Sequence, residues 1–297
     1  MDFTLTSDEP KVIRAYAKIN LSLEVLGRRP DGYHSLVSVM QEISLADEIL
    51  ICPAAGVDVV ADDPLVGTSD NLAGAAARLL MRASREVRGA RISLHKHIPV
   101  AAGLAGGSAD AAATLVSLNR ISRAGLPVRR LLTLAARLGS DVPFFLYGGT
   151  CLVLGRGEHV VPLPAPAPVW YALSNPGIPV STARVFMELP RCEWSNGRAT
   201  ESIADDVRQG KVRLGPNDLQ TTLFRLYPAA RRCFDRQVAL APGRTSVTGS
   251  GPTVYSACSS MHEAHDIAAQ MRDAGYWADV ARSVNPRPGE NPCRSGS

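Results

Sequence analysis

The sequence predicts an α+β fold in two parts, and three features of the chain carry this prediction. Residues 12–26 alternate between apolar and polar side chains, which is the pattern of a β-strand. Residues 92–118 read as a strand, a glycine-rich loop and a helix in direct succession. Residues 162–168 contain four prolines, which favour a stiff, extended connector. We therefore expect hairpins and helices in two domains, 1–165 and 166–283.

Residues 12–26 predict a half-buried strand with one polar face, which carries Lys18, Asn20, Ser22 and Glu24. The turn at 30–32, Pro-Asp-Gly, brings Tyr33 and His34 to the end of this strand. A solvated sheet face is the commoner fate of such residues. A Tyr beside a His is also typical of a site that stacks on a ligand and hydrogen-bonds it.

The strand at 37–51 is predicted to contain a turn at Asp47 and Glu48, and a short strand follows at 58–63. The polar run Ser69-Asp70-Asn71 predicts the start of an alanine-rich helix that ends near residue 85. We expect residues 1–10 to be frayed and the Pro, Gly and Ser-rich tail 284–297 to be disordered.

The glycine-rich loop is the strongest functional signal in the sequence. Pro99 ends the preceding strand, three glycines follow at 103, 106 and 107, and Ser108 is predicted to cap the helix. Helix N-termini carry unpaired amides and a positive dipole end, so a di- or triphosphate is the expected ligand. Neither the P-loop pattern nor the dinucleotide pattern matches. A tight strand-to-helix turn without a ligand is the alternative.

Asp141 follows a predicted helix at 128–138 and has two interpretations. It can cap a short helix that Pro143 helps to start. It can also orient or deprotonate a hydroxyl group, as a carboxylate on a turn. A strand is then predicted at 150–154.

The second part of the chain predicts alternating strands and helices. Strands are expected at 169–173 and 277–281, with a strand, turn and strand over 246–258. Ser181 and Thr182 should cap a short helix, and further helices are expected at 217–226 and 262–274.

Composition restricts the class of protein. The net charge of +4 is mild and no aromatic-interleaved basic patch occurs, which gives no indication of nucleic-acid binding. The chain has no run of eighteen apolar residues, and its first twenty residues contain no apolar signal segment, so we expect a cytoplasmic protein that does not bind membranes. Six scattered cysteines fit small apolar residues of a reducing compartment. Oligomeric state has no signature in the sequence.

Three motifs follow one another along the chain. They are Ala17-Lys18-Ile19-Asn20-Leu21, Pro99 to Ala112 with Gly-Leu-Ala-Gly-Gly-Ser at its centre, and Thr248-Gly249-Ser250-Gly251-Pro252. Together they resemble the GHMP kinases, a family of small-molecule ATP-dependent kinases. The resemblance implies the two-domain fold of that family, with the active site in the interdomain cleft.

Three further segments narrow the resemblance within the family. They are Arg29-Pro30-Asp31-Gly32-Tyr33-His34, Gly139-Ser140-Asp141-Val142-Pro143-Phe144-Phe145 and Asn175-Pro176-Gly177. They are similar to family members that use ATP to phosphorylate the 2-hydroxyl of CDP-methylerythritol in non-mevalonate isoprenoid synthesis. Kinases acting on mevalonate, phosphomevalonate, homoserine or a sugar are the nearest alternative, followed by a binding protein that has lost the chemistry and by a nucleotide-binding domain of unknown substrate.

The resemblance also implies roles for single residues. Lys18 and Asp141 match the catalytic pair, in which Asp141 accepts the hydroxyl proton. Asn20, Tyr33 and His34 match positions that hold the cytidine diphosphate end of the substrate, and Ser181 and Thr182 lie in a further substrate-side segment. ATP would bind at Pro99, Val100, Ala101, Ala102, Gly103, Leu104, Ala105, Gly106, Gly107, Ser108 and Ala109. Magnesium is expected with ATP, but no pair of acidic residues indicates its ligands.

Ala105 departs from the family pattern, which usually has glycine at this position. We expect the alanine to be tolerated, provided that its φ angle is negative and its methyl group points away from the phosphates.

Overall fold

The computed structural model describes residues 12–64, 66 and 71–285. Some of the predictions concern residues outside these ranges: the frayed segment 1–10, Ser69 and Asp70 before the alanine-rich helix, and most of the tail. The first sheet contains β1 (Ile13–Arg28), β2 (His34–Pro53), β3 (Val57–Ala61), β4 (Ala90–His95), β5 (Thr150–Gly155) and β6 (His159–Pro162). The second sheet contains β7 (Trp170–Asn175), β8 (Thr245–Val247), β9 (Val254–Cys258) and β10 (Trp277–Arg282). The mixed α+β fold is confirmed.

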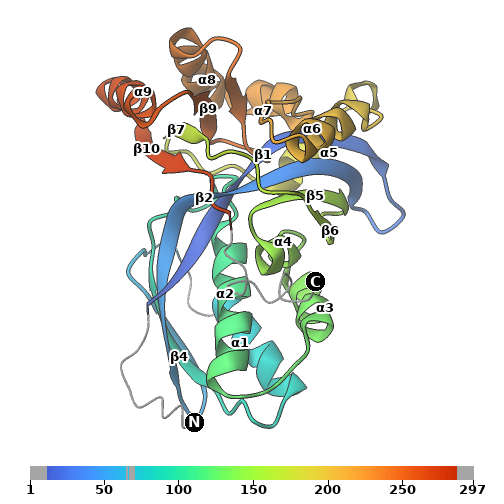
Figure 1. Cartoon of the computed structure of the whole chain (residues 1–297), viewed down its shortest axis with the longest axis vertical. Coiled ribbons are helices and arrows are strands. Elements are labelled where there is room, and N and C mark those ends of the chain that lie inside the picture. The colour runs from blue at the N-terminus through green and yellow to red at the C-terminus, as the bar shows by residue number, and fades with distance from the viewer. Residues whose placement is uncertain (1–11, 65, 67–70, 286–297) are drawn as a thin grey trace.

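Strand β2 organises the first sheet, because it is long enough to pair with three neighbours. It runs antiparallel to β1 along one edge, while its residues 36–41 pair with β5 and its residues 48–53 pair with β4 on the other. Strand β3 then adds to β4 in parallel, and β6 adds to β5. In the second sheet the order is β10-β7-β9-β8. Figure 1 shows β1 and β2 extending between the helices of the first part and the second sheet.

Helices cover both sheets. They are α1 (Leu72–Ala83), α2 (Gly106–Ile121), α3 (Val128–Leu138), α4 (Val142–Tyr147), α5 (Thr182–Met187), α6 (Arg198–Arg208), α7 (Leu219–Leu226), α8 (Pro228–Leu240) and α9 (Met261–Asp273), with a 3-10 turn at Arg191–Glu193. The predicted helix at 128–138 is confirmed, as is the capping of α5, where Ser181 accepts a hydrogen bond from the Arg184 amide. Helices α6 and α8 were not predicted.

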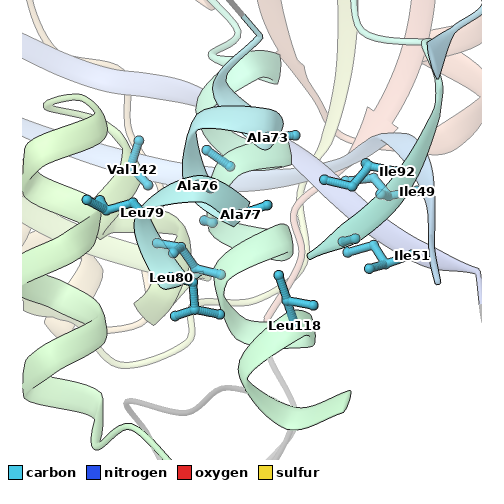
Figure 2. Packing of buried hydrophobic residues seen from close by; sticks show 14 of the residues in the cluster. Ile49, Ile51, Ala73, Ala76, Ala77, Leu79, Leu80, Ile92, Leu118 and Val142 are labelled. Atoms are coloured by element: carbon cyan, nitrogen blue, oxygen red, sulfur yellow. The ribbon is translucent and has the colours of Figure 1, made fainter. Parts of the chain in front are cut away.

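Helix α1 begins as predicted at a polar cap, since the Asn71 side chain accepts hydrogen bonds from the Ala73 and Gly74 amides. It packs with α2 against the inner face of the first sheet. Figure 2 shows its small side chains facing the strands. This core is formed by Ile49, Ile51 and Ile92 from the strands, Ala73, Ala76, Ala77, Leu79 and Leu80 from α1, Leu118 from α2 and Val142 from α4.

The prediction that β1 is half-buried is wrong, and so is the alternative of a solvated polar face. Lys18, Asn20, Ser22 and Glu24 are all at most 3% exposed. The second part of the chain covers this face: the Tyr255 hydroxyl donates to the Asn20 carbonyl at 2.6 Å, and Glu24 accepts the Thr200 amide at 2.6 Å at the start of α6. Buried polar groups need such partners, and here they come from residues more than 170 positions away.

The predicted turn at Asp47 and Glu48 is also wrong, because β2 continues through both residues. Asp47 is fully buried and accepts hydrogen bonds from the amides of His97 and Ile98, at 2.7 and 2.8 Å. A carboxylate that looks like a turn residue in the sequence thus fixes the backbone that leads into the glycine-rich loop.

The proline-rich connector runs from β6 in the first sheet to β7 in the second. We propose that the boundary between domains 1–165 and 166–283 lies here. A shared cluster of buried residues joins the two sheets across it, including Ile19 and Leu21 of β1 with Tyr171 and Tyr255.

Candidate active site

A cleft of about 1180 Å³ is lined by residues of both parts of the chain. The glycine-rich loop lines this cleft, and so do Tyr33 and His34. Lys18 and Asp141 line the same cleft, as do Thr182 and the turn residues Gly249 and Ser250. The structure thus brings together residues that are more than 200 positions apart in the sequence.

The glycine-rich loop leads into α2 three residues earlier than predicted. The helix begins at Gly106, and the residue before it, Ala105, takes the capping position without a side-chain hydrogen bond. Ser108 therefore lies inside the first turn of the helix and is not its cap. The φ angle of Ala105 is +58°, in the left-handed region, so the condition of a negative φ, on which tolerance of the alanine depended, is not met. Gly106, Gly107 and Ser108 of the first turn of α2 still line the cleft, and the first amides of a helix have no partners within it.

We expect Ala105→Gly to increase the free energy of unfolding by about 0.5–1 kcal/mol, because a left-handed alanine is strained and glycine is not. Urea denaturation would measure the change. Ala109→Gly is the matched control: Ala109 lies in α2 and is buried, so the same substitution there should lower stability by about 1 kcal/mol or more. Equal signs for the two variants would contradict the strain at Ala105.

Gly103 joins the loop to the third motif. Its carbonyl accepts a hydrogen bond from Lys18 Nζ at 2.7 Å and one from Thr248 Oγ1 at 3.3 Å. A Cβ atom at Gly103 would lie 2.4 Å from the Thr248 carbonyl oxygen, and its φ angle is +78°. Only glycine fits here, for both steric and conformational reasons.

Lys18 and Asp141 face each other in the cleft. Lys18 Nζ lies 3.9 Å from Asp141 Oδ2 and donates a 2.7 Å hydrogen bond to Asn20 Oδ1. Burial lowers the pKa of Lys18, and the Asp141 charge opposes this shift. Asp141 stands at the capping position of α4 but makes no capping hydrogen bond, and 30% of its side chain is exposed. The capping interpretation of its side chain is therefore wrong, and the carboxylate is accessible from the cleft.

Asn20 is held inside the protein. Its Oδ1 accepts from Lys18 Nζ and from Thr248 Oγ1, while its Nδ2 donates to Ser38 Oγ at 2.8 Å. Asn20 lines the cleft but is only 2% exposed. These contacts fix the position of the Lys18 ammonium group.

Aromatic rings surround His34. The His34 ring lies 5.4 Å from that of Phe186 and 6.1 Å from that of Trp194, between centroids. Burial and the nearby Arg28 charge lower the pKa of His34, so the imidazole is neutral at pH 7 and carries one donor and one acceptor. Tyr33, 52% exposed, lies beneath the guanidinium of Arg156. Sequence reasoning missed Phe186 and Trp194, although Phe186 follows closely on the correctly predicted cap of α5.

A buried ionic cluster lies beside the loop. Lys96 Nζ contacts Asp47 and, at 2.7 Å, Asp110. Burial would lower the pKa of Lys96, but the two carboxylates outweigh it and raise it. Burial, with the neighbouring Asp47 charge, raises the pKa of Asp110 to about 7 against the opposing effect of Lys96. The Lys96 ammonium group thus forms ion pairs with both Asp47 and Asp110 at the base of the loop.

Most of the predicted site residues line the cleft. Three do not: Leu104 and Ala109 are buried in the core, and Ser181 caps α5 outside the lining. The residues that do line it are Lys18, Asn20, Tyr33, His34, Pro99, Val100, Ala101, Ala102, Gly103, Ala105, Gly106, Gly107, Ser108, Asp141 and Thr182.

Within residues 12–64, 66 and 71–285, no group of three or more His, Cys, Asp or Glu side chains is arranged to hold a metal ion. The same part of the chain has no helix of the length and apolarity that crossing a membrane requires.

Comparison with known proteins agrees with this architecture. Residues 71–149 match the model of the GHMP kinases N terminal domain. The chain is 43% identical over 251 residues to a 4-diphosphocytidyl-2-C-methyl-D-erythritol kinase of Geobacillus thermodenitrificans, which covers 82% of this chain and 86% of the relative. It is 40% identical over 278 residues to the protein of the same name from Geobacter metallireducens, covering 91% and 96% of the two chains.

Solved structures give the same picture. A crystal structure of 4-(cytidine 5'-diphospho)-2C-methyl-D-erythritol kinase superposes with a TM-score of 0.81 at 33% identity, covering 93% of this chain and all of the other. A homoserine kinase from Cytophaga hutchinsonii shares the fold, with a TM-score of 0.70 at 20% identity over 96% of this chain and 97% of that one.

Proposed function

Given that the chain belongs to the 4-diphosphocytidyl-2-C-methyl-D-erythritol kinases of the GHMP kinase family, we propose that it transfers the γ-phosphoryl group of ATP to the 2-hydroxyl of CDP-methylerythritol. This reaction belongs to non-mevalonate isoprenoid synthesis. The observation that supports it best is the Lys18 and Asp141 pair, 3.9 Å apart in the cleft that the glycine-rich loop and the Tyr33-His34 segment both line. The product would be the 2-phosphate of the substrate, with ADP as the other product.

The glycine-rich loop would hold the ATP phosphates. The amides at the start of α2 have no partners within the helix and lie at its positive end, which suits a polyphosphate. Gly107 in this first turn lines the cleft, and a Cβ atom there would make only an ordinary van der Waals contact with Leu72, at 3.6 Å. Magnesium would arrive with ATP and neutralise phosphate charge, and we propose that phosphate oxygens and water supply most of its ligands.

Asp141 would accept the proton of the 2-hydroxyl as that oxygen attacks the γ-phosphorus. The bond between the γ-phosphorus and the β,γ-bridging oxygen then breaks, and ADP leaves. Lys18 would stabilise the negative charge that develops on the transferred group. Its amine is positioned for this by Asn20 and the Gly103 carbonyl, which accept two of its hydrogen bonds. We accordingly assign Asn20 mainly to fixing Lys18.

The cytidine end of the substrate would bind at Tyr33 and His34. Tyr33 presents an exposed ring on which cytosine can stack, and the neutral His34 can hydrogen-bond the base. Phe186 stands against His34 and would enclose the same base. Thr182, hydrogen-bonded to Ser250 at 2.8 Å, joins α5 to the third motif at the edge of the substrate site. Ser181 would act only through the capping of α5.

An ADP-release assay with Mg-ATP and four acceptors tests the proposal: CDP-methylerythritol, mevalonate, homoserine and galactose. Release with CDP-methylerythritol alone, together with a singly phosphorylated product by mass spectrometry, is the expected result. Release with one of the other acceptors would retain the kinase chemistry and overturn the substrate assignment. ATP binding without release for any acceptor would favour a binding protein.

His34→Ala should raise KM for CDP-methylerythritol about tenfold or more and leave KM for ATP nearly unchanged, because it removes hydrogen bonds to a base in a partly buried site. Steady-state kinetics with each substrate varied in turn would measure both constants. His262→Ala is a suitable control, since His262 lies on α9 with 89% of its side chain exposed. A rise in KM for ATP alone would mean that the two ends of the site are reversed.

A further inference from the structure

We propose that Arg156 is a positioning residue whose guanidinium group binds the diphosphate of the cytidylyl substrate. The proposal rests on the function proposed above and extends it to a residue outside the three motifs. Its basis is that the Arg156 guanidinium contacts the ring of Tyr33, while the turn that carries it packs on Ser140, the residue before Asp141.

The turn that carries Arg156 lies against the reacting centre. Arg156 is the residue between Gly155 and Gly157 at the end of β5, and its amide donates a 2.6 Å hydrogen bond to Glu158 Oε2. A Cβ atom at Gly157 would lie 3.2 Å from the Ser140 Cβ and 3.3 Å from its carbonyl oxygen. The turn therefore packs directly on the residue that precedes Asp141.

The side chain of Arg156 extends from this turn to the other part of the site. Its Cζ lies 4.8 Å from the centroid of the Tyr33 ring, in a cation–π arrangement. Arg156 lines the cleft, and 27% of its side chain is exposed. Its Nε is 3.8 Å from Glu158 Oε1, which is too long for a hydrogen bond. The guanidinium group is thus held by the Tyr33 ring and by an ion pair with Glu158, and neither contact takes up one of its hydrogen-bond donors.

The negative charge of the substrate, on its diphosphate, would lie near Arg156. In CDP-methylerythritol the diphosphate links the cytidine to the alcohol that carries the 2-hydroxyl. If cytosine stacks at Tyr33 and the 2-hydroxyl reaches Asp141, the two phosphates must pass between these residues. Arginine suits such a ligand, because its planar fork can donate two parallel hydrogen bonds to phosphate oxygens.

The two lysines of the cleft are engaged elsewhere. Lys18 is bound to the Gly103 carbonyl and Asn20 beside Asp141, and Lys96 is enclosed by Asp47 and Asp110. Arg28 and Arg191 also line the cleft, but both lie on the His34 side: the Arg28 charge acts on His34, and the Arg191 guanidinium lies 5.8 Å from the Trp194 ring. Arg156, in contrast, contacts the Tyr33 ring, and the turn that carries it packs on the residue before Asp141.

Titration calorimetry with cytidine and with CDP tests the proposal without turnover. Saturating ADP in both titrations keeps CDP out of the nucleotide site. Arg156→Gln should weaken CDP binding about tenfold to a hundredfold, the usual effect of losing a hydrogen bond to a charged group, and leave cytidine binding within about threefold. Arg156→Lys should fall between, since it keeps the charge and loses the fork. Arg91→Gln is the control: it removes one positive charge from a side chain of β4 that is 69% exposed and lies outside the cleft.

The possible results separate the two proposals. If the unaltered chain prefers CDP to cytidine and Arg156→Gln keeps that preference, the role of Arg156 is wrong and the proposed function stands. Equal losses for cytidine and CDP would show that Arg156 acts on Tyr33 alone, which also overturns the proposal. If the unaltered chain binds neither compound, the proposed function fails and the inference with it. If Arg156→Gln does not fold, the ratio of CDP affinity to cytidine affinity is measured for Arg156→Lys instead. A lower ratio than in the unaltered chain supports the role of Arg156, and an unchanged ratio overturns it.

Discussion

Asp141→Asn is expected to lower kcat by about 100-fold to 10,000-fold while KM for both substrates changes little, because the amide cannot accept the hydroxyl proton. The carboxylate is placed for this function: it stands at the start of α4 without capping it, and Lys18 lies 3.9 Å away. The amide has nearly the same shape and replaces a partly exposed group, so the fold should be retained. Initial-rate assays with thermal melts of each variant would separate catalysis from stability.

Asp58→Asn provides the control for this experiment. Asp58 lies on β3 with 62% of its side chain exposed and faces Arg91, outside the cleft. Its replacement should leave kcat unchanged. A rate for Asp141→Asn within about tenfold of the unaltered chain would contradict the role in proton transfer.

Gly103→Ala should lower the free energy of unfolding by about 3 kcal/mol. The new Cβ would lie 2.4 Å from the Thr248 carbonyl and 2.9 Å from that of Gly251, so the backbone of one of the two motifs would have to move. The left-handed φ angle adds about 1 kcal/mol to the cost. Movement of the loop would also displace the Gly103 carbonyl from Lys18, so activity should fall as well.

Gly210→Ala separates the steric effect of the new Cβ atom from the effect of the left-handed φ angle. Gly210 has a φ angle of +80°, nearly that of Gly103, but no atom lies within 4 Å of the Cβ position. Gly210→Ala should lower the free energy of unfolding only by the cost of an alanine with a left-handed φ angle, about 1 kcal/mol. If the two variants have the same midpoint in urea denaturation, the close approach of the two motifs does not contribute to stability.

The parts of the fold that could be predicted were those with local signals. The Asn71 cap, the helix at 128–138 and the Ser181 cap depend on neighbouring residues, and the structure has each of them where the sequence placed it. Ser108 had a similar local signal and failed, because Ala105 adopts a left-handed conformation that starts the helix earlier. An alanine gives no indication that its φ angle will be positive.

The parts that could not be predicted depend on distant contacts. Asp47 resembles a turn residue until the amides of His97 and Ile98 are brought to it by the pairing of β2 with β4. The polar face of β1 resembles a solvated face until Tyr255 and α6 cover it. For the site, the motifs predicted Lys18 and Asp141 through resemblance, whereas Arg156 has no signal of its own in the sequence and is identified by its distance from Tyr33.

The hydrogen bonds from Thr248 and Tyr255 to Asn20 and Gly103 have a consequence for how activity is acquired during folding. The ammonium group of Lys18 obtains its surroundings from the N-terminal strand, the glycine-rich loop and a turn near residue 250, and the last of these is synthesised long after the first two. A nascent or truncated chain that ends before the turn would therefore expose a polar strand face and lack a competent lysine, even with its first sheet complete. Catalytic activity of this chain therefore requires that both halves have folded and assembled.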